Sequence, residues 1–115
     1  MPTGYGYRRW NHSGQERRVI RRRGGRPLRK YGYDGRLHGR PVEVRSVRKD
    51  DRYRIQRNTH REMVRKHGSY IFVDRSERTR RIPARQVSRM VGQGQWFKDR
   101  SYPHKFVRRR QVFKA

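Results

Sequence analysis

The chain has 115 residues, of which 34 are Lys or Arg and 9 are Asp or Glu, so its formal net charge is +25. Only 30% of the residues are hydrophobic and cysteine is absent, which excludes a disulfide framework and a thiolate metal site. The sequence holds no apolar run long enough to cross a membrane and no apolar signal segment near its N-terminus. We therefore expect one small domain that acts in the cytoplasm or inside a nucleoprotein particle.

The charge balance predicts an anionic partner. A compact chain with this charge repels itself, and low hydrophobicity with high net charge is typical of segments that order only against a partner. Arginine supplies 28 of the 34 basic residues, and its planar guanidinium binds phosphate through two parallel hydrogen bonds. The predicted partner is nucleic acid, together with neighbouring proteins in a large complex. Neither a membrane nor a small-molecule substrate is expected.

The first segment, Met1–Arg40, is predicted to be an extended basic arm. It carries 12 basic residues, 2 acidic residues and eight glycines, and its large apolar residues follow no regular period. Such a segment is expected to be ordered mainly by its partner.

The middle segment, residues 41–91, is predicted to form the core. Apolar and charged residues alternate over 42–45 and again over 53–55, and the polar stretch 48–51 lies between them. Two alternating segments joined by a polar turn predict a β-hairpin.

A short helix and a strand are predicted next. Thr59 and Glu62 have the spacing of a capping box, and Gly68 suits the C-terminal end of a helix. The residues Ser69–Val73 form a continuous run of β-formers, which predicts a central strand.

A second short helix is predicted over residues 84–91, because Pro83 precedes it and Gly92 follows it. The same region supports a different interpretation. The residues Ile82-Pro83-Ala84-Arg85-Gln86-Val87 resemble the closing turn of SH3-like barrels, and this resemblance implies a small β-barrel core as the alternative fold. The last segment, residues 92–115, is predicted to be a second basic, aromatic arm with one strand near Phe106 or Val112.

The predicted fold class is therefore α+β, with a small core between two basic arms. The core would hold a β-hairpin, a further strand and one or two short helices.

The residues predicted to bind nucleic acid are arginine clusters and the aromatic residues near them. Aromatic rings beside cations can stack on unpaired bases, which favours RNA over DNA. Trp96 and Phe97 can equally cover the core. The predicted contact residues are Arg8, Arg9, Arg17, Arg18, Arg21, Arg22, Arg23, Arg26, Arg29, Lys30, Arg80, Arg81, Arg108, Arg109, Arg110, Tyr5, Tyr7, Trp10, Tyr31 and Tyr33.

One stretch within the first arm resembles two kinds of known segment. Arg23-Gly24-Gly25-Arg26-Pro27 is similar to RGG-type segments and to the core of AT-hooks, with one glycine inserted. The second resemblance implies reading of the DNA minor groove, and a flexible basic loop is the alternative.

Enzymatic chemistry has few candidates in the sequence. His60 and His67 lie seven residues apart, and Asp50 and Asp51 could supply a carboxylate, but no recognised ligand spacing is present. We therefore expect no cofactor and no catalysis. The predicted function is that of a structural nucleic-acid-binding protein, first of all in a ribosome or another structured-RNA particle. The alternatives are a virion or nucleoid protein that condenses the genome, and a small nuclease using His60 and Asp50.

Overall fold

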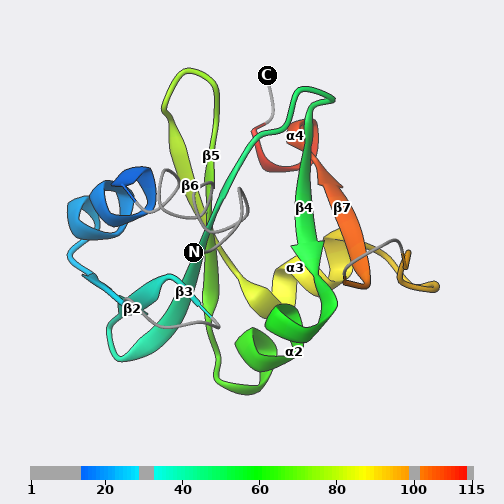
Figure 1. Ribbon diagram of the computed structural model, residues 1–115, viewed down its shortest axis with the longest axis horizontal. Coiled ribbons are helices and arrows are strands. Elements are labelled where there is room, and N and C mark those ends of the chain that lie inside the picture. The colour runs from blue at the N-terminus through cyan, green and yellow to red at the C-terminus, as the bar shows by residue number, and fades with distance from the viewer. Residues whose placement is uncertain (1–13, 29–32, 99–101, 114–115) are drawn as a thin grey trace, which may run out of the picture.

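The computed structural model describes residues 14–28, 33–98 and 102–113, and the described part is α+β, as predicted (Figure 1). A mixed sheet has the strand order β1-β2-β3-β5-β6, and β4 pairs with β7 in a separate two-stranded sheet. No closed barrel of the SH3-like kind is formed by the described residues. The strands are β1 (Arg26–Pro27), β2 (Gly35–Leu37), β3 (Arg40–Ser46), β4 (Arg52–Gln56), β5 (Ser69–Val73), β6 (Thr79–Pro83) and β7 (His104–Arg108).

The two middle strands of the mixed sheet, β3 and β5, run parallel, with Val42 opposite Ser69 and Val44 opposite Ile71. A parallel pair needs a long connection, and here β4 and helix α2 (Arg57–Arg65) supply it. Every residue of β5 is buried, as expected for a continuous apolar strand covered on both faces. The predicted central strand is therefore confirmed.

One face of the mixed sheet is covered by the helical residues 14–22. Val19 and Ile20 of this helix are buried in a cluster with Leu37, Val42 and Val44. The expectation of extended backbone is therefore wrong for residues 14–22, because two apolar side chains there suffice to dock a helix on the sheet. The division of the chain into an arm, a core and a second arm stays a prediction.

The other face carries the larger cluster. Tyr53 and Phe72 meet edge to face with ring centroids 4.7 Å apart, and Val107 and Val112 join them from the end of the chain. The strand predicted near Phe106 or Val112 is β7, whereas Val112 lies in helix α4 (Arg109–Val112). The C-terminal residues thus complete the core.

The predicted β-hairpin is wrong in its pairing. Both strands exist, as β3 and β4, but β3 pairs with β2 and β5 while β4 pairs with β7. Alternation of apolar and charged residues marks a strand with two different faces, and it carries no information about the neighbouring strand.

The two predicted helices are α2 and α3 (Ala84–Met90). Gly92 follows the end of α3 with a positive φ of 75°, as predicted, whereas α2 lacks the predicted capping box. Gln56 is the N-cap of α2 and makes no capping hydrogen bond, while Thr59 lies inside the helix. Glu62 instead accepts from Arg65, with Oε2 3.0 Å from the guanidinium Nε. None of the helices formed by the described residues has the length and apolar character needed to cross a bilayer.

Replacing Tyr53 by Phe tests a hydrogen bond that joins the two sheets. The buried phenol donates to the carbonyl of Val73 at 3.1 Å, and this carbonyl also accepts from the backbone of Val47 at 3.1 Å. Because Val73 keeps one donor, we expect Tyr53→Phe to lower the free energy of unfolding by only about 1 kcal/mol. Urea denaturation checks the value, and an unchanged midpoint would show that the hydrogen bond contributes nothing.

Candidate active site

Two carboxylates, Asp34 and Glu43, lie side by side where β2 begins. Gly35 is opposite Val42 in the antiparallel register, so the preceding residue, Asp34, lies opposite Glu43. The backbone N–H of Asp34 donates to the Val42 carbonyl at 3.0 Å, and the Val44 N–H donates to Asp34 Oδ2 at 2.7 Å. The aspartate is therefore fixed to β3 through its backbone and its side chain.

Gly35 is needed to hold this arrangement. A Cβ atom at this position would lie 2.6 Å from the carbonyl oxygen of Arg26 and 2.8 Å from Cδ1 of Ile20. Glycine thus allows β1 and the helix at residues 14–22 to close on β2 directly beside Asp34.

The Glu43 side chain is 7% exposed, and only one of its carboxylate oxygens has a partner. Oε2 accepts from a terminal nitrogen of Arg45 at 2.8 Å. Oε1 is buried and accepts no hydrogen bond, and the Nε atom of Arg45 is also buried without an acceptor. Buried polar atoms are nearly always satisfied, so an unsatisfied carboxylate oxygen indicates a place for a proton or a cation.

The electrostatics of the pair agree with this interpretation. Burial raises the pKa of Glu43 well above its usual value, Arg45 opposes that rise, and Asp34 adds to it. Asp34 acts both through its charge and because the protonated Glu43 can share a hydrogen bond with it; Glu16 makes the smallest contribution. Two adjacent carboxylates of this kind either share a proton or bind a cation.

A buried polar chain lies behind Glu43. Tyr70 is opposite Glu43 on β5, and its hydroxyl is 3.0 Å from Nδ1 of His60. The other ring nitrogen of His60 is 2.7 Å from the hydroxyl of Ser88, and burial lowers the pKa of this histidine. His60 is thus a satisfied core histidine, whereas Asp50 is exposed and pairs with Arg52. The predicted combination of His60 and Asp50 is not formed.

The donor set at the carboxylate pair fits a magnesium ion. Among the described residues, no three His, Cys, Asp or Glu side chains gather into a ready metal site. Magnesium, however, is commonly held by one or two carboxylates, with water and substrate phosphate filling its other positions. Glu43 Oε1 and the second oxygen of Asp34 are hard donors of the required kind.

Comparison with known families identifies the chain. The model of the PD-(D/E)XK nuclease superfamily domain matches residues 8–112, so the protein belongs to this superfamily. The superfamily's name states its motif: Pro-Asp, then Asp or Glu, any residue and Lys. The chain holds a similar pattern: Asp34, preceded by Tyr33 instead of Pro, and Glu43-Val44-Arg45, with Arg instead of Lys. No curated protein and no solved structure matches the chain significantly.

Membership corrects the predicted function. A nuclease superfamily domain points to catalysis, so the prediction of a non-catalytic structural protein, in a ribosome or in a virion or nucleoid, is wrong. Its assignment as a ribosomal, rRNA-binding protein has no support. The expected interaction with nucleic acid agrees with the superfamily.

The predicted nucleic-acid contacts are spread over the structure, and their role stays a prediction. Arg17, Arg18, Arg21 and Arg22 lie on the helix at residues 14–22, and Arg26 lies in β1. Several others have partners within the protein. Arg23 donates to Thr79, Arg80 to the Val112 carbonyl, Arg81 to Ser69 and Arg109 to Asp74. Tyr33 is half-buried, and the Lys66 ammonium lies 5.4 Å from its ring centroid.

Arg108 ends β7 and Arg110 lies in α4, and the other predicted contacts lie outside the described residues. These are Tyr5, Tyr7, Arg8, Arg9, Trp10, Arg29, Lys30 and Tyr31.

Sequence reasoning missed Asp34, Glu43 and Arg45 as a functional set. In the sequence, Glu43 and Arg45 fit the charged positions of an alternating strand. The available signal was an acidic residue, any residue and a basic residue within a predicted core strand, with an aspartate nine positions earlier.

Proposed function

We propose that the protein is a metal-dependent nuclease that hydrolyses phosphodiester bonds at the Asp34–Glu43 pair. One observation carries the proposal. The buried, unpartnered oxygen of Glu43 lies beside Asp34, and these two residues with Arg45 resemble the motif in the superfamily's name.

The roles of the residues follow from their chemistry. Asp34 and Glu43 would hold a divalent cation. When bound, such an ion activates a water molecule and neutralises charge on the phosphate. Arg45 would direct its guanidinium, which already contacts Glu43, at the phosphate oxygens. Since arginine keeps its proton in proteins, Arg45 supplies positive charge and cannot act as a general base.

The chain's net charge of +25 supports a polyanionic substrate. Basic side chains that neutralise backbone phosphates release counterions, so binding is expected to weaken steeply with salt. Within the proposal, RNA is the favoured substrate because aromatic side chains accompany the charges. Phe97 and Tyr102, 64% and 46% exposed, are the described aromatic residues most open to a base.

A four-substrate cleavage assay tests the proposal. The purified protein is incubated with end-labelled single- and double-stranded RNA and DNA, in magnesium or in EDTA. We expect cleavage of at least one substrate in magnesium and none in EDTA, because the carboxylate pair needs the cation. A preference for RNA in the same assay would support the substrate assignment, and a preference for DNA would overturn it.

A second readout does not depend on turnover. Magnesium is expected to raise the melting temperature of the wild-type protein and not that of Glu43→Gln, because the ion binds the folded state through this carboxylate. If magnesium and manganese give neither cleavage nor a shift specific to Glu43, the proposed function is wrong.

A further inference from the structure

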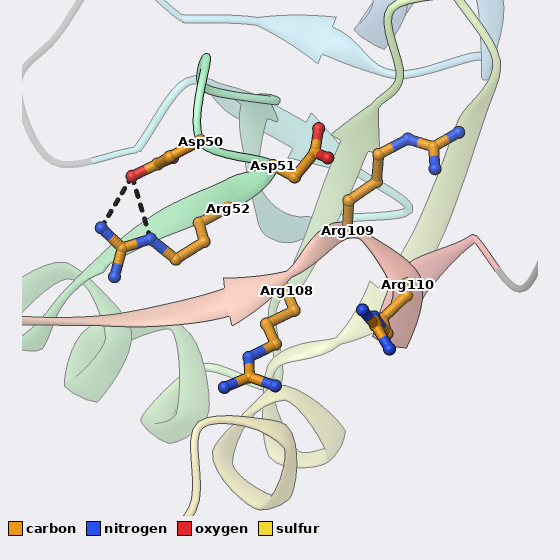
Figure 2. A pocket seen from close by; sticks show the side chains of 6 residues that line it. All are labelled: Asp50, Asp51, Arg52, Arg108, Arg109 and Arg110. Carbon is orange, nitrogen blue, oxygen red and sulfur yellow. Dashed lines mark hydrogen bonds and ion pairs between the residues drawn. The ribbon is translucent and has the colours of Figure 1, made fainter.

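A hollow of about 510 Å³ lies where the β3–β4 turn meets the junction of β7 and α4 (Figure 2). In Figure 1, β4, β7 and α4 lie on the opposite side of β5 from β2, whose first residue follows Asp34. The hollow is therefore built from different elements than the carboxylate pair. Its walls are Asp50, Asp51, Arg52, Arg108, Arg109 and Arg110, which we call the arginine pocket.

The acidic residues of the arginine pocket are already neutralised within the protein. Asp50 accepts two hydrogen bonds from Arg52, at 2.9 and 2.7 Å, and Asp51 forms an ion pair with Arg75. Because both carboxylates are already paired, the other arginines give the pocket an excess of positive charge.

Arg109 forms a fixed wall of the pocket. Its Nε and a terminal nitrogen donate to the two oxygens of Asp74, at 2.6 and 2.9 Å, and the Asp74 side chain is only 2% exposed. These contacts lower the pKa of Asp74, so the pair stays charged at neutral pH. The backbone N–H of Arg109 also donates to the Asp51 carbonyl at 2.8 Å, which ties the two sides of the hollow together.

Arg108 and Arg110 are the available cations of the pocket. Both are exposed, and among the described residues neither guanidinium donates a hydrogen bond or forms an ion pair; the Arg108 side chain lies against the backbone of Gln111 at the start of α4. Figure 2 shows their side chains leaving β7 and α4 on the same side, while the side chain of Arg109 leaves on the other. Two guanidiniums on residues two positions apart, on a backbone held by Arg109, can both donate to one tetrahedral anion.

We propose that the arginine pocket binds a phosphate of the nucleic-acid backbone, as an anchor separate from the site of cleavage. Arg108 and Arg110 donate to the phosphate oxygens, whereas the charge of Arg52 is already balanced by Asp50. The proposal takes its substrate class from the proposed nuclease function, but it requires no catalysis. It assigns to Arg108 and Arg110 the contact role and to Arg109 a structural one.

The test compares two double variants that remove the same charge. Arg108→Ser/Arg110→Ser empties the pocket, and Arg61→Ser/Arg85→Ser removes two exposed arginines from α2 and α3. Binding of a fluorescent 20-nucleotide RNA and of the matching DNA is measured in EDTA, so that cleavage does not contribute. We expect the pocket variant to raise Kd about tenfold or more and to reduce the salt slope by roughly 1–2, against less than about threefold for the control.

Two results would overturn the proposal. If both double variants weaken binding equally, only the net charge matters. If inorganic phosphate raises the melting temperature of the wild type but not of the pocket variant, while both bind the oligonucleotides equally, the ligand is free phosphate. If the nuclease proposal is wrong, the wild-type protein does not cleave nucleic acid in magnesium. The binding measurements in EDTA test the arginine pocket independently of that result.

Discussion

Glu43→Gln is expected to reduce cleavage by roughly 10²–10⁴-fold while leaving nucleic-acid binding equal or tighter. Glutamine keeps the size of the side chain and removes the negative charge that would hold the cation at the unpartnered oxygen. Affinity for nucleic acid is not expected to fall, because the substitution removes a negative charge that repels the phosphate backbone. Initial rates under saturating substrate and fluorescence-anisotropy titrations separate the two quantities.

The same variant is expected to be at least as stable as the wild type. Burial raises the pKa of Glu43, so the folded state favours the protonated form. Its contribution to stability is therefore present at pH values below the usual carboxyl pKa, and it is lost as pH rises through the raised pKa of the folded state. Wherever the buried carboxylate is charged it destabilises the fold, and the neutral amide removes this cost.

Glu62→Gln serves as the matched control. Glu62 lies on α2 and pairs with Arg65 and Lys66 at the surface, so its loss should change neither cleavage nor melting by much. Equal activity of Glu43→Gln and Glu62→Gln would remove Glu43 from the active site.

Replacement of Asp34 is expected to separate chemistry from structure. Asp34→Asn keeps an oxygen that can accept from the buried Val44 N–H, so folding should be little affected while cleavage falls by roughly 10²-fold or more. Asp34→Ala removes the acceptor as well, and leaving this N–H unsatisfied should cost about a further 1–3 kcal/mol of stability.

Denaturant unfolding and cleavage assays on both variants check this expectation. If Asp34→Asn cuts the substrate as fast as the wild type, the carboxylate serves only to hold β3. If both variants unfold at the same denaturant concentration, the hydrogen bond to Val44 does not contribute to the stability of the fold.

Local patterns in the sequence were enough to locate several elements of the fold. The β-forming run Ser69–Val73 became the buried β5, and Pro83 with Gly92 bounded α3. These signals act over a few residues. The pairing of β3 could not be predicted from such local signals, because its partner β5 follows it in the sequence only after β4 and α2.

The candidate active site was hidden for a related reason. Glu43 and Arg45 alternate with apolar residues, as in a strand with one solvent-exposed face. That pattern gives no sign that Glu43 is buried. Asp34 lay in a glycine-rich stretch with no apolar period. Only the antiparallel register of β2 and β3 brings its carboxylate to Glu43. The arginine-rich composition, by contrast, indicated the polyanionic partner at once, because net charge does not depend on the fold.

The pairing of β4 with β7 also bears on how the protein is made. Gln56 lies opposite His104, a separation of 104 − 56 = 48 residues. A nascent chain elongating at about 5–20 residues per second exposes β4 for roughly 2–10 s before its partner is synthesised. During that interval Tyr53 and Ile55, both fully buried in the finished protein, have no β7 to cover them. The sheet that carries Asp34 and Glu43 can assemble first, and the second sheet closes last.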